Sequence, residues 1–154
     1  MIHQNRRKEL LSKLDKNAVV IVSTNSEQKR NSDVNYPFRP DSSFWYLTGF
    51  IEPDAIAVFS KNDYSIFLNP KDKTKEIWNG KRLGVELAPK ALLANQAYDI
   101  DTFLDEIESL VDKDSSVYFD APTTGGWKDI SSTNILNESI SSIFKNKIKP
   151  LNPY

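Results

Sequence analysis

Residues 39–54 read Arg39-Pro-Asp-Ser-Ser-Phe-Trp-Tyr-Leu-Thr-Gly-Phe-Ile-Glu-Pro-Asp54 and place four aromatic side chains between turn-forming residues. Three of the four are adjacent, and adjacent side chains cannot all face the same way in a strand or in a helix. At least one of Phe44, Trp45 and Tyr46 should therefore fill a core while another reaches a rim, a loop or a partner surface. By itself the cluster favours a core-filling turn, which Gly49 is predicted to end because glycine adopts positive φ without a Cβ penalty.

The segments around this stretch carry apolar patterns typical of alternating strands and helices. A chain of 154 residues is long enough for one domain with a substantial core and short for two. Strands are predicted at 18–22, 55–59, 64–68, 117–119 and 147–151, and helices at 4–15, 85–93, 102–112 and from the caps at Ser131-Ser132-Thr133 to Phe144. We therefore expect one α/β domain, residues 1–154, with a mixed β-sheet flanked by helices.

Shorter features refine this arrangement. Four polar residues join the second and third predicted strands, which suits an antiparallel hairpin. The lysine-rich stretch 71–75 is predicted to be a solvated loop, followed by a helical turn at 76–78 that Gly80 closes. Pro89 should break or restart the helix at 85–93, because proline has no backbone N–H to continue it.

The composition excludes several classes of function. With 39% hydrophobic and 27% charged residues and a net charge of -1, the chain gives no general reason to expect nucleic-acid or membrane binding. The absence of cysteine excludes disulfides, thiolate catalysis and cysteine-ligated zinc. The chain starts with polar residues and has no apolar run near the ~18 residues of a membrane span, so a cytoplasmic protein is expected.

Three sequence blocks follow one another in a specific order. They are Arg30-Asn31-Ser32-Asp33-Val34-Asn35-Tyr36-Pro37-Phe38-Arg39, the aromatic stretch itself as far as Ala55, and Glu76-Ile77-Trp78-Asn79-Gly80-Lys81-Arg82-Leu83-Gly84. In this order and spacing they resemble the amino-terminal domain of aminopeptidase P, the metal-dependent Xaa-Pro aminopeptidase. The resemblance covers residues 5–100 well and the remainder loosely, and it implies the creatinase/aminopeptidase type of amino-terminal domain.

The resemblance also implies where the chemistry lies. The family's enzymes hydrolyse the bond after the first residue of a peptide whose second residue is proline. They use two metal ions, usually manganese, held by two Asp, one His and two Glu of a carboxy-terminal domain with the pita-bread fold. This chain has one histidine, His3, so that metal-binding domain is expected to be absent from residues 1–154, which would then be non-catalytic and bind no cofactor.

Two residues acquire a candidate role from the same resemblance. In the family's tetramers an aspartate and a tryptophan of this domain reach the active site of a neighbouring subunit, and the matching positions here are Asp33 and Trp78. A carboxylate can pair with the α-ammonium group of a peptide, and an indole can pack against proline. The structural alternatives are a turn residue for Asp33 and a buried anchor for Trp78.

Other polar residues have plainer interpretations. A lone histidine near the chain start lacks an orienting partner, so His3 is expected to be an exposed side chain. Arg39 is predicted to form a structural ion pair with Asp41 or Glu52. Lys81-Arg82, beside Trp78, could contact a peptide carboxylate or an acidic partner, although exposed basic pairs usually do neither. Gly125-Gly126 lacks the lysine of a phosphate loop and is expected to make a turn. Four carboxylates are expected to form the solvent face of the helix at 102–112, namely Asp101, Asp105, Glu106 and Glu108.

Three functions are consistent with these patterns. The first is the amino-terminal domain of a manganese-dependent Xaa-Pro aminopeptidase, which aids subunit assembly and shapes access of peptide N-termini to the active site. Its expected partners are the carboxy-terminal catalytic domain, other subunits of a homo-oligomer and peptides with proline second, with no nucleic acid and no membrane. The alternative is a stand-alone peptide-binding or protein-interaction module of the same domain type. A third, binding of single-stranded nucleic acid by the aromatic cluster, lacks the basic groove that stacking platforms normally use.

Overall fold

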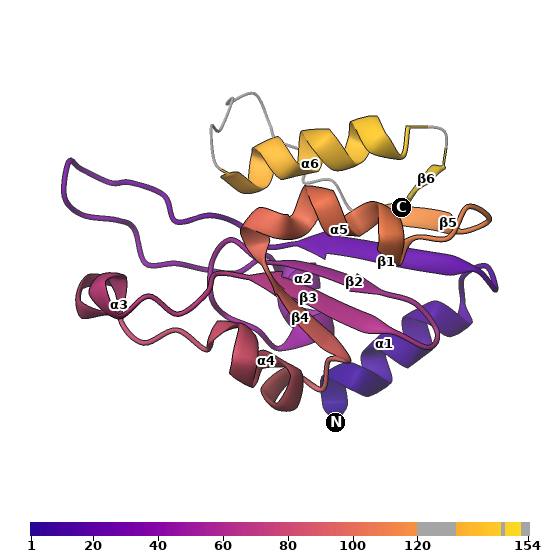
Figure 1. The fold of residues 1–154 in the computed structure, drawn as a ribbon, viewed down its shortest axis with the longest axis horizontal. Coiled ribbons are helices and arrows are strands. Elements are labelled where there is room, and N and C mark those ends of the chain that lie inside the picture. The colour runs from indigo at the N-terminus through magenta and orange to yellow at the C-terminus, as the bar shows by residue number, and fades with distance from the viewer. Residues whose placement is uncertain (120–131, 146, 152–154) are drawn as a thin grey trace.

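The computed structural model describes residues 1–119, 132–145 and 147–151 and shows alternating helices and strands (Figure 1). The first half of the chain contains α1 (Ile2–Ser12), β1 (Ala18–Ser23), α2 (Ser42–Thr48), β2 (Ile56–Phe59), β3 (Tyr64–Leu68) and α3 (Lys73–Asn79). The second half contains α4 (Gly84–Leu92), β4 (Gln96–Asp99), a 3-10 turn η1 (Ile100–Thr102), α5 (Phe103–Leu110), β5 (Ser116–Phe119), α6 (Ser132–Ile143) and β6 (Ile148–Pro150).

The strands form one mixed sheet in the order β4-β3-β2-β1-β5-β6. β2 pairs antiparallel with both β1 and β3, whereas β4 pairs parallel with β3, β5 with β1 and β6 with β5. Val20 and Val22 of β1 pack into one core and Val19 and Ile21 into the other, which explains why this strand is a continuous apolar run. The mixed sheet and the β2–β3 hairpin are confirmed.

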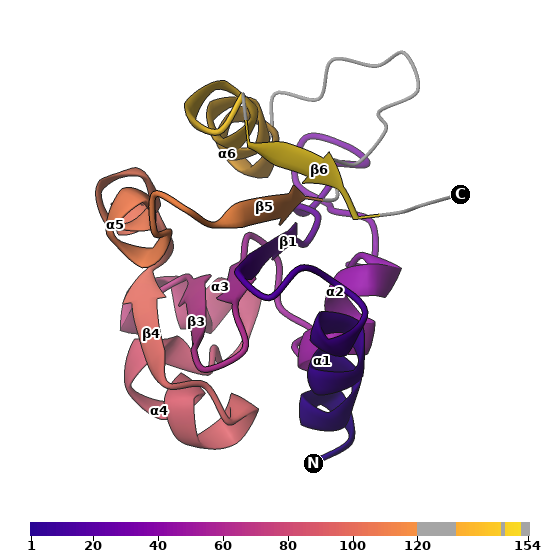
Figure 2. The same cartoon turned by 90° about the vertical axis from the view of Figure 1, so that its right-hand side faces the viewer.

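Helices cover both faces of the sheet, as Figure 2 shows. The core on one face includes Phe44 and Leu47 of α2 and Ala88 of α4, with leucines of α1 packed against it. The core on the other face includes Phe103 and Ile107 of α5 together with Ile140 of α6 and Phe144, which follows that helix. The arrangement is therefore a three-layer α/β domain, as the alternating sequence pattern predicts.

The aromatic stretch folds as the short helix α2. Asp41 caps its N-terminus by accepting a hydrogen bond from the Phe44 backbone N–H at 2.9 Å, and Gly49 ends it at φ 73°. Phe44 is fully buried, whereas Trp45 and Tyr46 are about half exposed. The prediction that the three aromatic residues divide between core and rim is confirmed, in a helix rather than a turn.

Several sequence predictions needed correction. Residues 73–75 are helical rather than loop, because the Asp72 side chain accepts from the N–H groups of Thr74 and Lys75 and starts α3 early. α4 continues through Pro89, since one lost hydrogen bond does not stop a helix that buries Ala88 against the sheet. β4 was not predicted, because this four-residue edge strand buries none of its residues and so lacks the apolar pattern of a strand.

Two residues that were predicted to lie on the apolar faces of helices are exposed. They are Leu104 of α5 and Ile143 of α6, whose spacing predicted core positions. Phe103, Ile107, Ile140 and Phe144 are buried as expected. Gly125-Gly126 and the side chains of residues 132–137 lie outside the described part of the structure.

A buried arginine joins α1 to the sheet and to α2. The Arg7 guanidinium lies 3.9 Å from the centre of the Tyr64 ring on β3, and its Nη1 donates to the Leu47 carbonyl at 2.7 Å. Burial lowers the pKa of Arg7, and burial raises the pKa of Tyr64 from 10.0 to about 12 although the nearby guanidinium opposes this. Among the described residues the Tyr64 hydroxyl has no hydrogen-bond partner.

The raised pKa of Tyr64 predicts a loss of stability at alkaline pH. The unfolded chain releases the Tyr64 proton near pH 10, whereas the folded chain holds it to about pH 12. Rising pH therefore stabilises the unfolded state first, and about 2–3 kcal/mol of stability is lost between these values. Urea unfolding from pH 8 to 12 should show this loss in the wild type and lack it in Tyr64→Phe.

Comparing Tyr64→Phe with the wild type separates the effect of the Tyr64 hydroxyl from that of the other titrating side chains. Tyr64→Phe keeps the ring under Arg7 and removes an unpaired hydroxyl, so near neutral pH its stability should stay within about 1 kcal/mol of the wild type. Tyr46→Phe, at a half-exposed ring, is the matched control and should follow the wild-type profile. Parallel profiles for Tyr64→Phe and the wild type would contradict the prediction.

Candidate functional site

Two segments project from the same end of the molecule (Figure 1). One is the loop of residues 25–40 between β1 and α2, here called the arm, and the other is α3. The arm doubles back on itself through a single bridge between Lys29 and Asn35. The two segments carry the residues that the sequence singled out, Asp33 on the arm and Trp78 on α3.

The tip of the arm presents Asp33 to solvent. Asp33 lies in a tight turn in which the N–H groups of Arg30 and Asn31 both donate to the Val34 carbonyl, at 2.8 and 3.1 Å. Arg30 also lies over the Tyr36 ring, with 5.9 Å to its centre. The turn assignment for Asp33 is therefore correct, and it leaves the carboxylate exposed and available to a partner.

α3 presents Trp78 to solvent. The helix has no buried residue, and Ile77 and Trp78 are 78% and 86% exposed. An indole is rarely left so exposed without a partner, because it forgoes the burial that stabilises large aromatic side chains. The alternative of a buried anchor is thus wrong, and Trp78 is a candidate contact for another molecule.

The bases of the two projections meet at a small polar joint. Glu27 of the arm accepts from Arg82 Nη2 at 3.4 Å through Oε1 and from Asn35 Nδ2 at 2.9 Å through Oε2. The backbone N–H of Arg82 in turn donates to Glu76 Oε1 of α3 at 3.1 Å. A cavity of about 270 Å³, lined by Glu27, Glu76, Arg82 and Asp72 among others, lies at this joint.

Two predictions about charged residues are corrected here. Arg82 is not an exposed basic residue, because its side chain is only 17% exposed in the ion pair with Glu27. Within the described residues Arg39 forms no ion pair with Asp41 or Glu52. Asp41 caps α2 instead, and Glu52 accepts from the Leu83 backbone N–H at 2.7 Å, which anchors the chain after α3 to the end of the aromatic stretch.

The remaining polar candidates do not join this site. His3 is partly buried rather than exposed, since its Nδ1 donates to the Tyr46 carbonyl at 2.9 Å and its ring packs against that of Trp45, with 5.9 Å between the ring centres. Asp101, Asp105 and Glu108 are exposed on the solvent side of η1 and α5, as predicted, and Glu106 is partly exposed. Across the described residues no group of three or more His, Cys, Asp or Glu could hold a metal ion.

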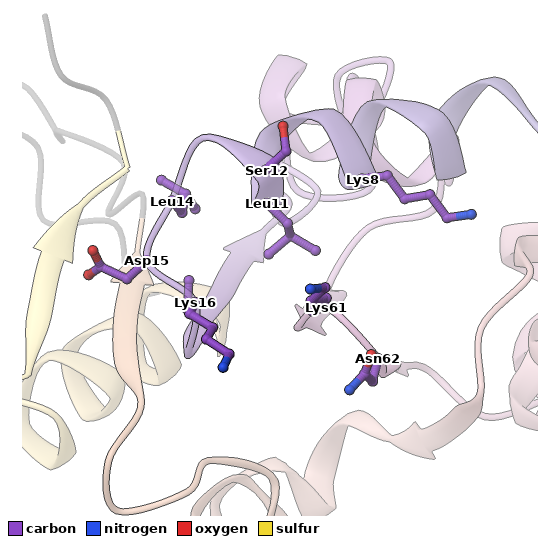
Figure 3. Close-up of a pocket in the computed structure, with 9 residues that line it drawn as sticks. Lys8, Leu11, Ser12, Leu14, Asp15, Lys16, Lys61 and Asn62 are labelled. Carbon is purple, nitrogen blue, oxygen red and sulfur yellow. The ribbon is translucent and has the colours of Figure 1, made fainter.

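A larger hollow lies elsewhere, beside the C-terminal end of α1 and the β2–β3 turn (Figure 3). It has a volume of about 530 Å³, with Leu11 on its wall and Lys8, Lys16 and Lys61 around it. Asp15 at its edge is bound by Lys149 and Tyr118. No residue of this hollow belongs to the arm or to α3.

In the described part of the chain, no helix is long and apolar enough to cross a membrane.

Sequence inspection missed Glu27 and the role of Arg82. The two residues are separated by 55 positions, and their pairing depends on how the arm and α3 leave the sheet. A local pattern carries no signal for such a contact, since both residue types are ordinarily solvated. The sequence indicated only that Lys81-Arg82, within the third block, could contact an acidic partner.

Comparisons with known proteins agree with the fold. A family model described as "Aminopeptidase P, N-terminal domain" matches residues 3–118. The Xaa-Pro aminopeptidase of Haemophilus influenzae is 38% identical over 130 residues, covering 82% of this chain and 30% of the relative. Intermediate cleaving peptidase 55 of Saccharomyces cerevisiae is 27% identical, covering 97% of this chain and 32% of the relative.

Solved structures give the same result. Zinc-substituted Escherichia coli aminopeptidase P in complex with product matches with a TM-score of 0.78 at 26% identity, over 94% of this chain and 33% of that one. Proline aminopeptidase P II from Yersinia pestis matches with a TM-score of 0.73 at 30% identity, over 97% of this chain and 35% of that one. The chain thus spans about a third of the length of these proteins. Because the family model takes in α1 to β5 and more than half of the 154 residues, the chain belongs to the family of aminopeptidase P amino-terminal domains.

Proposed function

We propose that this chain is the non-catalytic amino-terminal domain of a manganese-dependent Xaa-Pro aminopeptidase, in which it aids subunit assembly and shapes the access of peptide N-termini to the active site. The observation that carries the proposal is the exposure of Trp78 at 86% on a helix with no buried residue, beside an arm that exposes Asp33. Two such projections at one end of a domain suit insertion into a neighbouring subunit. The names of the relatives support the peptidase class.

The chemistry of the two side chains fits peptide ends with proline second. An enzyme that removes one residue must recognise the free α-ammonium group, and the Asp33 carboxylate can form a charge-assisted hydrogen bond with it. The Trp78 indole offers a flat apolar face against which a proline ring can pack. In this proposal both groups reach the active site of an adjacent subunit and narrow its mouth to peptide termini.

Manganese has no place among the described residues of this chain. The donor set that a two-metal hydrolase needs combines several carboxylates with imidazole, and no group of that kind is present in the part of the chain that the structure describes. The proposal therefore assigns the two manganese ions to a carboxy-terminal catalytic domain. The cytoplasmic location stays a prediction, and one relative, from Arabidopsis thaliana, is named mitochondrial.

The proposal predicts that the isolated chain does not hydrolyse Xaa-Pro peptides. Purified residues 1–154 incubated with manganese and a Xaa-Pro-Xaa peptide should release no amino acid, whereas the full-length enzyme in the same buffer should. The measurement is chromatographic detection of the freed first residue. Turnover that follows the 154-residue chain through successive purification steps would overturn the assignment of catalysis to another domain.

A further inference from the structure

Glu27 uses its two carboxylate oxygens in two different directions. Oε2 accepts from Asn35 on the returning half of the arm, and Oε1 accepts from Arg82 on the segment after α3. A carboxylate that accepts from two sides fixes the position of both donors, because each bond restrains the rotamer that the other needs. Glu27 therefore links the two halves of the arm to each other and to the neighbouring projection.

The hydrogen bonds of Glu27 connect to α3 through Arg82. Arg82, held by Glu27 through its side chain, donates its backbone N–H to the Glu76 carboxylate. One end of this series, Asn35, lies two residues from Asp33, and the other end, Glu76, lies two residues from Trp78. The series Asn35–Glu27–Arg82–Glu76 thus connects the immediate surroundings of both candidate contact residues.

Neither the arm nor α3 has buried residues that could fix its position relative to the other. α3 buries no residue, and every residue from 28 to 37 of the arm is exposed, so neither projection is held by a core of its own. The Glu27–Arg82 pair differs from an ordinary surface pair, since its side chains are 31% and 17% exposed against 65% and 69% for Glu9 and Lys13. Partly buried pairs are screened less by solvent and salt than exposed ones.

We propose that Glu27 and Arg82 are positioning residues that hold the arm and α3 in a fixed relation, so that Asp33 and Trp78 are presented together. The consequence for peptide hydrolysis rests on the proposed function, but the positioning itself is a property of this chain. Loss of the pair should leave each projection folded locally while letting the two move independently. The separation between the projections is therefore the quantity to measure.

Spin labels can report that separation directly. The natural chain contains no cysteine, so Ser32→Cys on the arm and Lys73→Cys on α3 add the only two labelling sites. Both positions are exposed and neither side chain belongs to the linking series. Pulsed electron–electron distance measurements on the doubly labelled 154-residue chain should give one main distance, and in Glu27→Gln the population outside that peak should rise by a factor of roughly two to five.

A double-mutant cycle and a matched control separate this role from a general effect of charge. Arg82→Gln should broaden the distances as Glu27→Gln does, and the double variant should broaden them no further, because both remove one interaction. Glu9→Gln, which removes the carboxylate of the exposed pair with Lys13, should leave the distances unchanged. Distances in Glu27→Gln as narrow as in the wild type, with the thermal melt preserved, would overturn the proposal.

A kinetic measurement distinguishes this inference from the proposed function. In the full-length enzyme, Glu27→Gln should lower kcat/KM for a Xaa-Pro peptide by roughly the same two- to fivefold factor as it broadens the distances. Broadened distances with unchanged kcat/KM would support the positioning role and count against a contact of these projections with the active site. Narrow distances would refute the positioning role whatever the kinetics.

Discussion

Replacing Trp78 with alanine in the full-length enzyme should lower kcat/KM for Xaa-Pro peptides by roughly ten- to hundredfold. In the proposed function, the indole that is exposed in this domain becomes buried against a neighbouring subunit and its substrate, and burying a large apolar side chain contributes about 1.5–3 kcal/mol. Because Trp78 packs against no core, the free energy of unfolding should change by less than about 0.5 kcal/mol. Steady-state kinetics and urea unfolding measure the two quantities.

Trp45 supplies the matched control for this substitution. It is also exposed, at 45% against 86% for Trp78, but it lies on α2 and packs against the His3 ring rather than belonging to a projection. Trp45→Ala should reduce stability through that lost contact and leave kcat/KM unchanged, the opposite of Trp78→Ala. Unchanged kcat/KM in Trp78→Ala, or strong destabilisation with normal kinetics in the folded fraction, would contradict the role assigned to Trp78.

Subunit mixing tests whether the contact crosses between chains. A Trp78→Ala enzyme keeps an intact catalytic domain, and a second variant with an inactivated catalytic domain keeps an intact Trp78. If the indole serves a neighbour, oligomers reassembled from both variants should be more active than the average of the two variants. If it serves its own chain, mixtures should show only the average of the two.

The core of this fold could be predicted from the sequence because its signals are local. The continuous apolar run of β1 indicates burial on both faces, and the adjacent aromatic residues of α2 require a division between core and rim. Gly49 marks the end of α2 by its tolerance of positive φ. Each of these features is decided within a few residues, so pattern and structure agree.

The parts that could not be predicted depend on distant partners. The pattern of α1 placed Arg7 at an apolar edge, but its full burial follows from the approach of Tyr64 and Leu47, at least 40 positions away in sequence. The same holds for Glu27 and Arg82, whose types are common on surfaces. The exposure of Trp78 likewise depends on the path of α3, which projects away from the sheet and buries no residue.

Arg7→Ala is expected to destabilise the domain by about 2–4 kcal/mol. Arg7 is 5% exposed, and its guanidinium binds the Leu47 carbonyl in the last turn of α2, where helix carbonyls lack intrahelical partners. Alanine would leave that carbonyl unpaired, at about 1–3 kcal/mol, and would remove the contact with the Tyr64 ring, at about 0.5–2 kcal/mol. Thermal and urea unfolding of the variant measure the loss.

Arg6 is the control that the chain itself offers. It precedes Arg7 on the same helix and makes the same two kinds of contact, a hydrogen bond to the Tyr46 carbonyl at 3.2 Å and a position 4.0 Å from the Tyr46 ring centre, but it is not buried. Arg6→Ala should therefore cost less than about 1 kcal/mol, because water can replace its contacts. Equal losses for the two alanine variants would show that burial is not what makes Arg7 important.

Arg7→Met separates the packing of Arg7 from its hydrogen bond. Methionine keeps an apolar stem of similar reach along the edge of α1 but cannot donate to the Leu47 carbonyl. If the donor is what fixes the start of the chain onto the end of α2, Arg7→Met should lose at least half of the stability that Arg7→Ala loses. Near-complete recovery would instead assign the role to the stem. In the first case α1 is a C-terminal cap for α2, with His3, Arg6 and Arg7 all donating to its final carbonyls.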